Sequence, residues 1–196
     1  HAQGGRPRTV RVEPWDEARD ARLYAGPRAV VAHPPCERWG RYWSGGPSAK
    51  VRRRKGDDDG CFASALASVR AWGGVIEHPE ASAAWRAHGL IPPLRNGGWS
   101  VADWVGGWTC CVEQGHYGHR ARKATWLYAV GVDLPSLRWG PAHGKNRLDD
   151  GFHSAEKRRR AVKTGVCQRL SSKQRSATPI PFRDLLLGIA ATARCG

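Results

Sequence analysis

The stretch from Ala29 to Cys36 constrains the fold more than any other part of this sequence. It runs Ala-Val-Val-Ala-His-Pro-Pro-Cys, a short apolar, β-branched segment that ends at two prolines. Such a segment is typical of a buried strand, and proline ends a strand because its φ is fixed and it has no N–H to donate. We therefore predict a strand over residues 28–32. Cys36 would lie on a stiff turn at its carboxyl end, where open α/β sheets bind their ligands.

A second strand is predicted over residues 75–79, Val-Ile-Glu-His-Pro, which again stops at a proline. Between the two strands, residues 61–72 carry apolar side chains at helical spacing, and a Gly-Gly pair follows them as at a helix C-terminus. Strand, helix and strand in this order predict a right-handed crossover between two parallel strands. Cys36 and Glu77 would then lie at the carboxyl ends of neighbouring strands.

The other elements follow from the same periodicity and from capping signals. We expect strands at 9–13, 108–113 and 125–131, the last two as an antiparallel pair at the sheet edge, helical turns within 15–24, and helices at 80–88 and 154–163. A final helix would be capped by Thr178, would accept Pro179 or Pro181 in its first turn, and would face the core with Phe182, Leu185, Leu186 and Ile189.

The length of 196 residues suits one domain with a sizeable core. We expect a flexible tail over residues 1–8 and a single α/β domain over 9–196 with a partly parallel sheet. A basic helical region would begin at about residue 153.

The charge balance favours a polyanionic partner. Lys and Arg number 32 against 17 Asp and Glu, which gives a formal net charge of +15. Such an excess is typical of proteins that bind nucleic acid, and DNA is the partner we expect. The candidate phosphate contacts are two basic runs, each of which could instead be a solvated face: Arg52, Arg53, Arg54 and Lys55, and Arg158, Arg159 and Arg160.

We expect neither a membrane span nor a secretory signal. No run of 18 apolar residues occurs, and the first residues, His-Ala-Gln-Gly-Gly-Arg, form no apolar segment. The six irregularly spaced cysteines are therefore expected to be reduced thiols in a cytoplasm. A zinc site at Cys110, Cys111, His116 and His119 is a weaker interpretation, because neighbouring residues of a strand point to opposite faces. We predict no metal.

Three motifs, in this order, resemble the cytosine-5 DNA methyltransferases. They are Pro35-Cys36, Glu77-His78-Pro79, and the run Tyr117-Gly-His-Arg-Ala-Arg122 that leads into a strand. The chain is most similar to short phage-type members, which share the His-Pro-Pro-Cys turn and a Lys-x-Thr-x-Leu strand, matched here by residues 123–127. The resemblance covers about residues 28–131. It implies a truncated class I methyltransferase fold, Rossmann-like, and a phage-encoded protein acting in a bacterial cytoplasm.

The resemblance also implies chemistry on a pyrimidine base that is flipped out of a duplex or single-stranded. Cys36 would be the nucleophile at C6, Glu77 would hold the N3 edge and move a proton, and Arg120 and Arg122 would bind the C2 carbonyl or a phosphate. Arg38, Arg41 and the basic loop 120–123 would lower the pKa of the thiol. Further substrate contacts are expected from His33, Pro35, Arg38, His78, Tyr117, His119 and Lys123.

The implied methyl donor is S-adenosylmethionine, which the family binds with a Phe-x-Gly-x-Gly loop. No such loop precedes Cys36, so the donor stays open: the same adduct could take another one-carbon electrophile, or water could displace the 4-amino group. Two other functions also stay open, a non-catalytic nucleic-acid-binding module derived from a methyltransferase fold and an enzyme on free nucleotides. Cys36 could also be a small packed side chain, and Glu77 a helix-capping residue.

Overall fold

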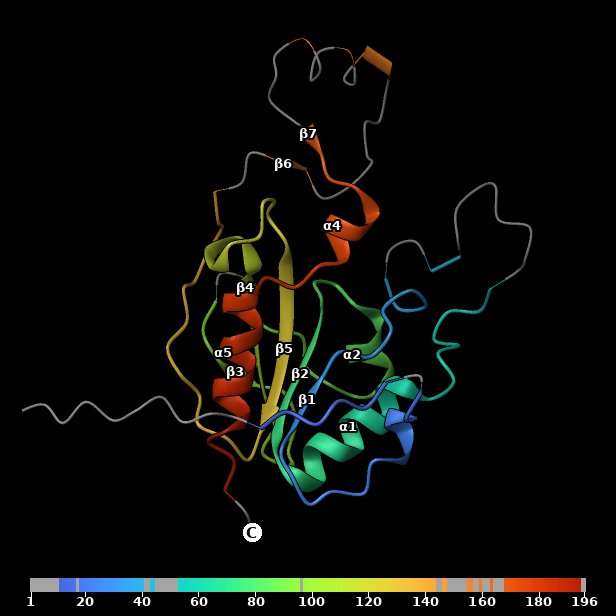
Figure 1. Ribbon diagram of the computed structural model, residues 1–196, viewed down its shortest axis with the longest axis vertical. Helices are drawn as coiled ribbons and strands as arrows, with labels where there is room; N and C mark the ends of the chain where they lie inside the picture. Colours follow the sequence, from blue (N-terminus) through green and yellow to red (C-terminus); the bar gives the residue numbers. More distant parts are fainter. Residues whose placement is uncertain are drawn as a thin grey trace, which may run out of the picture.

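The computed structural model describes residues 11–16, 18–40, 43–44, 53–95, 97–143, 146–147, 155–156, 159, 163 and 168–194. Within them the chain forms a mixed α/β fold around a five-stranded sheet (Figure 1). The strands of this sheet are β1 (Val30–Ala32), β2 (Gly74–Pro79), β3 (Ser100–Val101), β4 (Trp108–Glu113) and β5 (Ala124–Val130). Their order is β1-β2-β5-β4-β3. A separate parallel pair joins β6 (Asn146–Arg147) and β7 (Gln168–Arg169).

Helices pack on both faces of the main sheet (Figure 1). The helical elements are η1 (Ala21–Leu23), α1 (Cys61–Trp72), α2 (Ala83–Ala87), η2 (Gln114–Tyr117), α4 (Ser172–Ser176) and α5 (Ile180–Ala190). Helices α1 and α2 cover one face with Phe62, Val69 and Trp85. Helix α5 covers the other with Phe182, Leu186 and Ile189, as its sequence period predicts. The sheet is thus buried between two helical layers.

The predicted crossover is confirmed in its order and in the parallel pairing of β1 with β2. The two strands come very close at their start, because a Cβ on Gly74 would lie 2.0 Å from the carbonyl oxygen of Val30. Gly74 also has a φ of 136°, which other residues rarely adopt. The second glycine of the Gly-Gly pair therefore begins β2 and lets β1 lie against it.

The rest of the sheet is antiparallel, so only one pair of strands has the parallel arrangement of a doubly wound fold. Strand β5 pairs antiparallel with β4 as predicted, but it lies in the centre of the sheet, between β2 and β4, and not at the edge. The connection from β4 to β5 holds only residues 114–123, which is shorter than a crossover between parallel strands usually requires.

Several other predictions need correction. Residues 11–13 form no strand, the helix expected at 80–88 is limited to α2, and of the turns within 15–24 only η1 is helical. Thr178 does not cap α5, whose N-cap is Pro179 and whose first turn holds Pro181. The tail over 1–8 and most of the predicted helix 154–163 lie outside the described residues. In the part of the chain that the structure describes, no helix combines the length and the apolarity needed to cross a membrane.

Candidate active site

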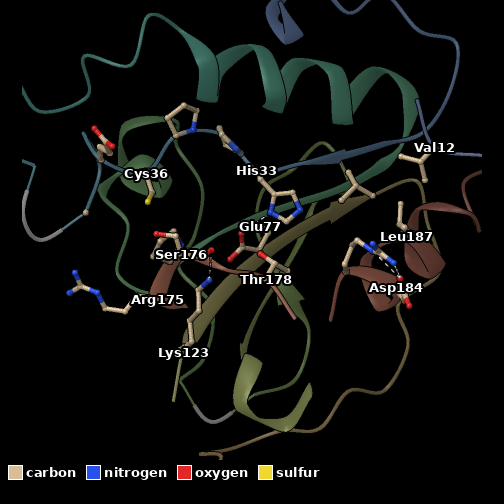
Figure 2. Close-up of a pocket in the computed structure, with 18 of the residues that line it drawn as sticks. Val12, His33, Cys36, Glu77, Lys123, Arg175, Ser176, Thr178, Asp184 and Leu187 are labelled. Atoms are coloured by element: carbon tan, nitrogen blue, oxygen red, sulfur yellow. Dashed lines mark hydrogen bonds and ion pairs between the residues drawn. The ribbon is translucent and has the colours of Figure 1, made fainter. Parts of the chain in front are cut away.

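A cleft of about 1660 Å³ opens where β1 and β2 end and β5 begins, on the side of the sheet that α5 covers (Figure 2). Its walls come from the turn after β1, the end of β2, the start of β5 and the segment from α4 into α5. The residues of that cleft used below are His33, Pro34, Pro35, Cys36, Arg53, Glu77, Lys123, Arg183, Asp184, Leu187 and Gly188.

Cys36 enters the cleft from the turn after β1. The turn is held because the Cys36 carbonyl accepts hydrogen bonds from the amides of Trp39 (3.1 Å) and Gly40 (3.0 Å). Although Cys36 is exposed by its accessible surface, nearby protein atoms desolvate its thiol and raise its pKa. The Glu77 and Glu37 carboxylates act in the same direction, and Lys123 acts against them. The pKa of the thiol is therefore raised, not lowered as expected from the basic loop, and the sulfur keeps its proton near neutral pH.

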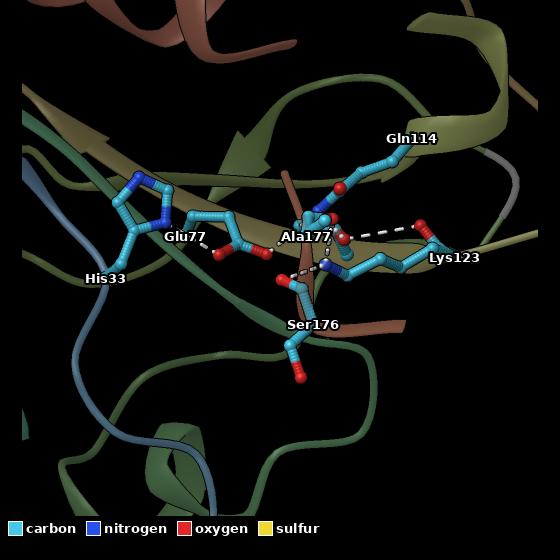
Figure 3. A network of polar contacts seen from close by, with 7 residues as sticks. His33, Glu77, Gln114, Lys123, Ser176 and Ala177 are labelled. Carbon is cyan, nitrogen blue, oxygen red and sulfur yellow. Dashed lines mark hydrogen bonds and ion pairs between the residues drawn. The ribbon is translucent and has the colours of Figure 1, made fainter. Parts of the chain in front are cut away.

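Glu77 is the centre of a hydrogen-bonded network on the cleft face of β2 (Figure 3). Its carboxylate lies 2.8 Å from Nδ1 of His33, which must donate because a carboxylate can only accept, and 3.1 Å from Nε2 of Gln114. Burial alone would raise the pKa of Glu77, but the hydrogen bond from His33 and the charge of Lys123 outweigh it and lower the pKa. Glu77 is therefore a buried, ionised group at the cleft wall.

Gln114 supports this carboxylate from behind and was not foreseen from the sequence. It is fully buried at the start of η2, and the same Nε2 that donates to Glu77 also lies 3.0 Å from the hydroxyl oxygen of Thr125. A buried amide with such partners fixes the rotamer of the group that it holds. No local signal marks Gln114, because only the pairing of β4 with β5 and of β5 with β2 brings it beneath Glu77.

Lys123 reaches the cleft from the residue just before β5. Its Nζ donates to the carbonyl oxygens of Ser176 (3.3 Å) and Ala177 (3.2 Å), so it ties the connection between α4 and α5 to the sheet (Figure 3). Partial burial lowers the pKa of Lys123, whereas Glu77 and Cys36 act to raise it. Its ammonium group is the cation that acts electrostatically on both Cys36 and Glu77.

No family model, curated protein or solved structure matches this chain. The resemblance to the methyltransferases is therefore an expectation from the sequence motifs alone.

The structure brings only some of the predicted site residues together. Cys36, Glu77, His33, Pro35, Lys123 and Arg53 line the cleft, whereas the described residues Arg38, His78, Tyr117, His119, Arg120, Arg122, Arg54 and Lys55 do not. Arg41, Arg52, Arg158 and Arg160 lie outside the described residues, and Arg159 is exposed. In the ranges that the structure describes, no three His, Cys, Asp or Glu side chains lie close enough to hold a metal ion.

The two arginines of the basic loop lie away from the cleft. Arg120 is exposed, and the exposed Arg122 pairs with Glu113, with 3.1 Å between Nη2 and Oε1. Tyr117 packs on Phe182, with 5.5 Å between ring centroids, and the Nδ1 atom of His119 bonds within its own loop. These side chains hold the loop, so the geometry leaves Lys123 as the loop's cation in the cleft.

His78 follows Glu77 along β2 but points to the opposite face. It is fully buried among aromatic rings, with 5.4 Å between its ring centroid and that of Phe62 and 6.2 Å to that of Trp85. Neither ring nitrogen has a hydrogen-bond partner. The Pro35 carbonyl acts to raise the pKa of His78, but burial outweighs it. Burial lowers the pKa of His78 to about 4, so it is a neutral core residue and does not contact the cleft.

Proposed function

We propose that this protein modifies a pyrimidine base of nucleic acid, most simply DNA, by adding the Cys36 thiol to C6 of the ring, in the manner of cytosine-5 methyltransferases. One observation carries the proposal: a cysteine, a carboxylate and an ammonium group from the ends of three strands open into the same cleft. The chemistry of pyrimidine C6 addition needs a group of each kind, and the three come from segments that are far apart in the sequence.

Each group suits one edge of the base. The thiol of Cys36 is placed at the mouth of the cleft, where C6 can approach it. Glu77 is fixed by two donors and keeps a free lone pair for the N3 edge. Lys123 takes the part that the resemblance gave to Arg120 and Arg122, donation to the C2 carbonyl oxygen. A base within a duplex cannot enter such a cleft, so the substrate is a flipped or single-stranded nucleotide.

The proposed step balances without an external oxidant or reductant. The Sγ–C6 bond forms as the C5=C6 electron pair moves onto C5, into conjugation with C4 and N3. The thiol proton leaves Sγ to water at the open cleft, and N3 takes up one proton from that water by way of the Glu77 carboxylate, which accepts the proton and passes it on, so Glu77 ends the step ionised as it began. C5 then has the character of an enamine carbon and can attack an electrophile. Because the pKa of the Cys36 thiol is raised, the thiol must lose its proton as it adds to the base.

One part of the fold supports the proposal. Cys36 and Glu77 follow β1 and β2, the parallel pair joined through α1, and the carboxyl ends of such strands are where doubly wound sheets place their ligands. The sheet departs from that pattern at β5, β4 and β3.

A donor must supply the group that C5 attacks, and S-adenosylmethionine would supply an electrophilic methyl group. The sequence lacks the glycine-rich loop before Cys36, but the cleft extends past Glu77 toward α5. There Leu187 and Gly188 border an open space, and Asp184 lies beside it, ion-paired with Arg183 at 2.7 Å. Leu187 and Gly188 would hold the apolar parts of such a donor.

The test is a covalent trap that needs no donor. A single-stranded oligonucleotide with one 2-pyrimidinone base offers a C6 that is more electrophilic than that of cytosine, because the electron-donating 4-amino group is missing. Intact-mass spectrometry should detect a one-to-one adduct with the wild type and with Cys61→Ser, a control at another partly exposed thiol, but none with Cys36→Ser. An adduct that survives Cys36→Ser, or none with the wild type, contradicts the proposal.

The raised pKa of Cys36 favours one alternative, a binding module without catalysis. Such a module would bind single-stranded oligonucleotides with strong salt dependence, equally well in the wild type and in Cys36→Ser. It would form no adduct with 2-pyrimidinone and would change no nucleoside of the DNA, with or without S-adenosylmethionine.

A further inference from the structure

The turn after β1 places the ring of His33 against Glu77 (Figure 3). Strands β1 and β2 are parallel, and Ala32 pairs with Ile76, so the next residues along the two strands are His33 and Glu77. Pro34 favours an extended backbone at His33, because the residue before a proline is restricted to that region. His33 therefore continues the line of β1, and its side chain lines the cleft beside Glu77.

The Glu77 carboxylate is held by two donors of different chemical kinds. Its Oε1 lies 3.1 Å from Nε2 of Gln114, and its Oε2 lies 2.8 Å from Nδ1 of His33. The Thr125 hydroxyl donates to the carbonyl of Lys123 at 3.3 Å, so its oxygen accepts from Gln114, which fixes the orientation of that amide. An amide keeps its protons, whereas an imidazole can take up a proton on one nitrogen and release one from the other. Of these two donors, His33 is therefore the one that can pass a proton to Glu77.

The two side chains also differ in their access to water. The His33 side chain is 39% exposed, against 10% for Glu77. Figure 3 shows the second ring nitrogen, Nε2, on the side of the ring that is turned away from Glu77. A base in the cleft would cover the carboxylate further. The ring of His33 therefore offers a path for a proton from water to the buried carboxylate.

We infer that His33 is a proton relay between water and Glu77 during the addition of Cys36 to the base. The inference rests on the proposed function, in which N3 must gain a proton as the Sγ–C6 bond forms. Nε2 of His33 takes up a proton from water as Nδ1 gives its proton to Oε2 of Glu77, and this carboxyl group passes a proton to N3.

The protons of this step balance. Glu77 ends as a carboxylate, and His33 keeps one ring proton, which is now on Nε2. The water that supplied a proton to His33 is compensated by the thiol proton that Cys36 releases to water. When Sγ later leaves C6, the same path in reverse returns the proton of N3 to water. His33 acts through Glu77 and does not need to touch the base.

The test compares two substitutions at one position. His33→Asn keeps an N–H donor near the place of Nδ1 but cannot relay a proton, and His33→Ala removes the donor and leaves room for a free imidazole. Both should slow adduct formation with the 2-pyrimidinone oligonucleotide by about 10²-fold or more, as for the loss of general acid–base catalysis. Millimolar imidazole, at fixed pH and ionic strength, should restore most of the lost rate in His33→Ala and none in His33→Asn, whose side chain occupies that place.

Gln114→Leu is the matched control, because it removes the other donor to Glu77. It should slow the reaction by loosening the carboxylate, and imidazole should not change its rate. The thermal midpoint of each variant shows whether it is folded, and a His33→Ala protein that does not fold leaves the decision to His33→Asn.

Two results would overturn the relay and leave the proposed function intact. One is a wild-type rate in His33→Asn, since a hydrogen bond to Glu77 would then be sufficient. The other is a folded His33→Ala variant that imidazole restores no better than Gln114→Leu. If the wild type itself forms no adduct, the proposed function fails and the relay fails with it.

Discussion

Glu77 and His78 are neighbours on β2, yet they belong to opposite faces of the sheet and to opposite kinds of environment. Glu77 meets two hydrogen-bond donors and an open cleft. His78 meets aromatic rings and no hydrogen-bond partner. Both are polar and both are almost fully buried. Burial therefore does not separate a site residue from a core residue in this protein, whereas hydrogen bonding and access to the cleft do.

The same contrast extends to the layers behind each residue. On the cleft face, Gln114 and Lys123 surround Glu77 with polar contacts that also fix the α4–α5 connection. On the aromatic face, His78 completes a cluster with Phe62 and Trp85 that joins α1 and α2 to the sheet. One face is organised to present charges, and the other to exclude water. Substitutions on the two faces should therefore affect different measurements.

The largest expected effect is on adduct formation. Glu77→Gln keeps the size of the side chain but cannot move a proton, so we expect the rate of adduct formation with a 2-pyrimidinone oligonucleotide to fall by about 10²–10⁴-fold. His78→Leu changes the adjacent residue on the aromatic face and should stay close to the wild-type rate. Single-turnover mass spectrometry measures both. Equal losses in the two variants would show that β2 acts only as a scaffold.

The second effect is on stability at acidic pH. The unfolded chain binds a proton at His78 below about pH 6.5, whereas the folded chain does so only near its lowered pKa of about 4. The unfolded state therefore binds more protons in this window, and the free energy of unfolding should fall, by roughly 3 kcal/mol in all, as the pH drops from 6.5 to 4. Urea denaturation at several pH values measures this slope.

His78→Leu is the control for that slope. It replaces an unpartnered buried imidazole by an apolar group, which can be neutral or stabilising. The slope above pH 4.5 should therefore become shallower in His78→Leu, leaving the contribution of His88, whose pKa burial also lowers, whereas Glu77→Gln should keep the full slope. The comparison is made above pH 4.5 because the lowered pKa of Glu77 means that its own contribution is lost only at lower pH. A slope that persists in full in His78→Leu would assign the titration to another group.

The sequence was sufficient for the elements that carry strong local signals. Prolines and β-branched residues marked β1 and β2, and the apolar period with its Gly-Gly end gave α1 to the residue. Together they placed Cys36 and Glu77 at the ends of paired strands. The position of β5 in the centre of the sheet could not be predicted, because strand order depends on long-range pairing that no local pattern records.

The other residues of the candidate site could not be predicted from the sequence, for related reasons. The Arg-x-Arg motif suggested Arg120 and Arg122, but strand alternation and the loop path leave both exposed and bring Lys123 to the cleft. The contribution of α5 depends on which helical face meets the sheet. The local signal for that contribution is Gly188, a glycine within a predicted helix.

A third experiment compares the positively charged side chains of the loop that precedes β5. Lys123→Met removes the ammonium beside Glu77 and the two hydrogen bonds to the α4–α5 connection, so adduct formation should slow by about tenfold or more, as for loss of a charged hydrogen bond of 1.5–3 kcal/mol. Arg120→Ala and Arg122→Ala should have little effect, because both side chains are exposed and away from the cleft. A larger loss with either arginine would restore the pattern of the resemblance.

The smallest expected effect is on the salt dependence of DNA binding, which should differ between arginines on the two faces of the sheet. Arg53 lines the cleft, whereas Arg86 is an exposed arginine of α2 in the layer over the aromatic face. Each substitution to alanine removes one positive charge, so net charge alone would affect both equally. A phosphate contact to single-stranded DNA contributes about 0.7 to the slope of log K against log salt. Fluorescence anisotropy should therefore show that loss for Arg53→Ala and an unchanged slope for Arg86→Ala, since only the cleft side binds the strand.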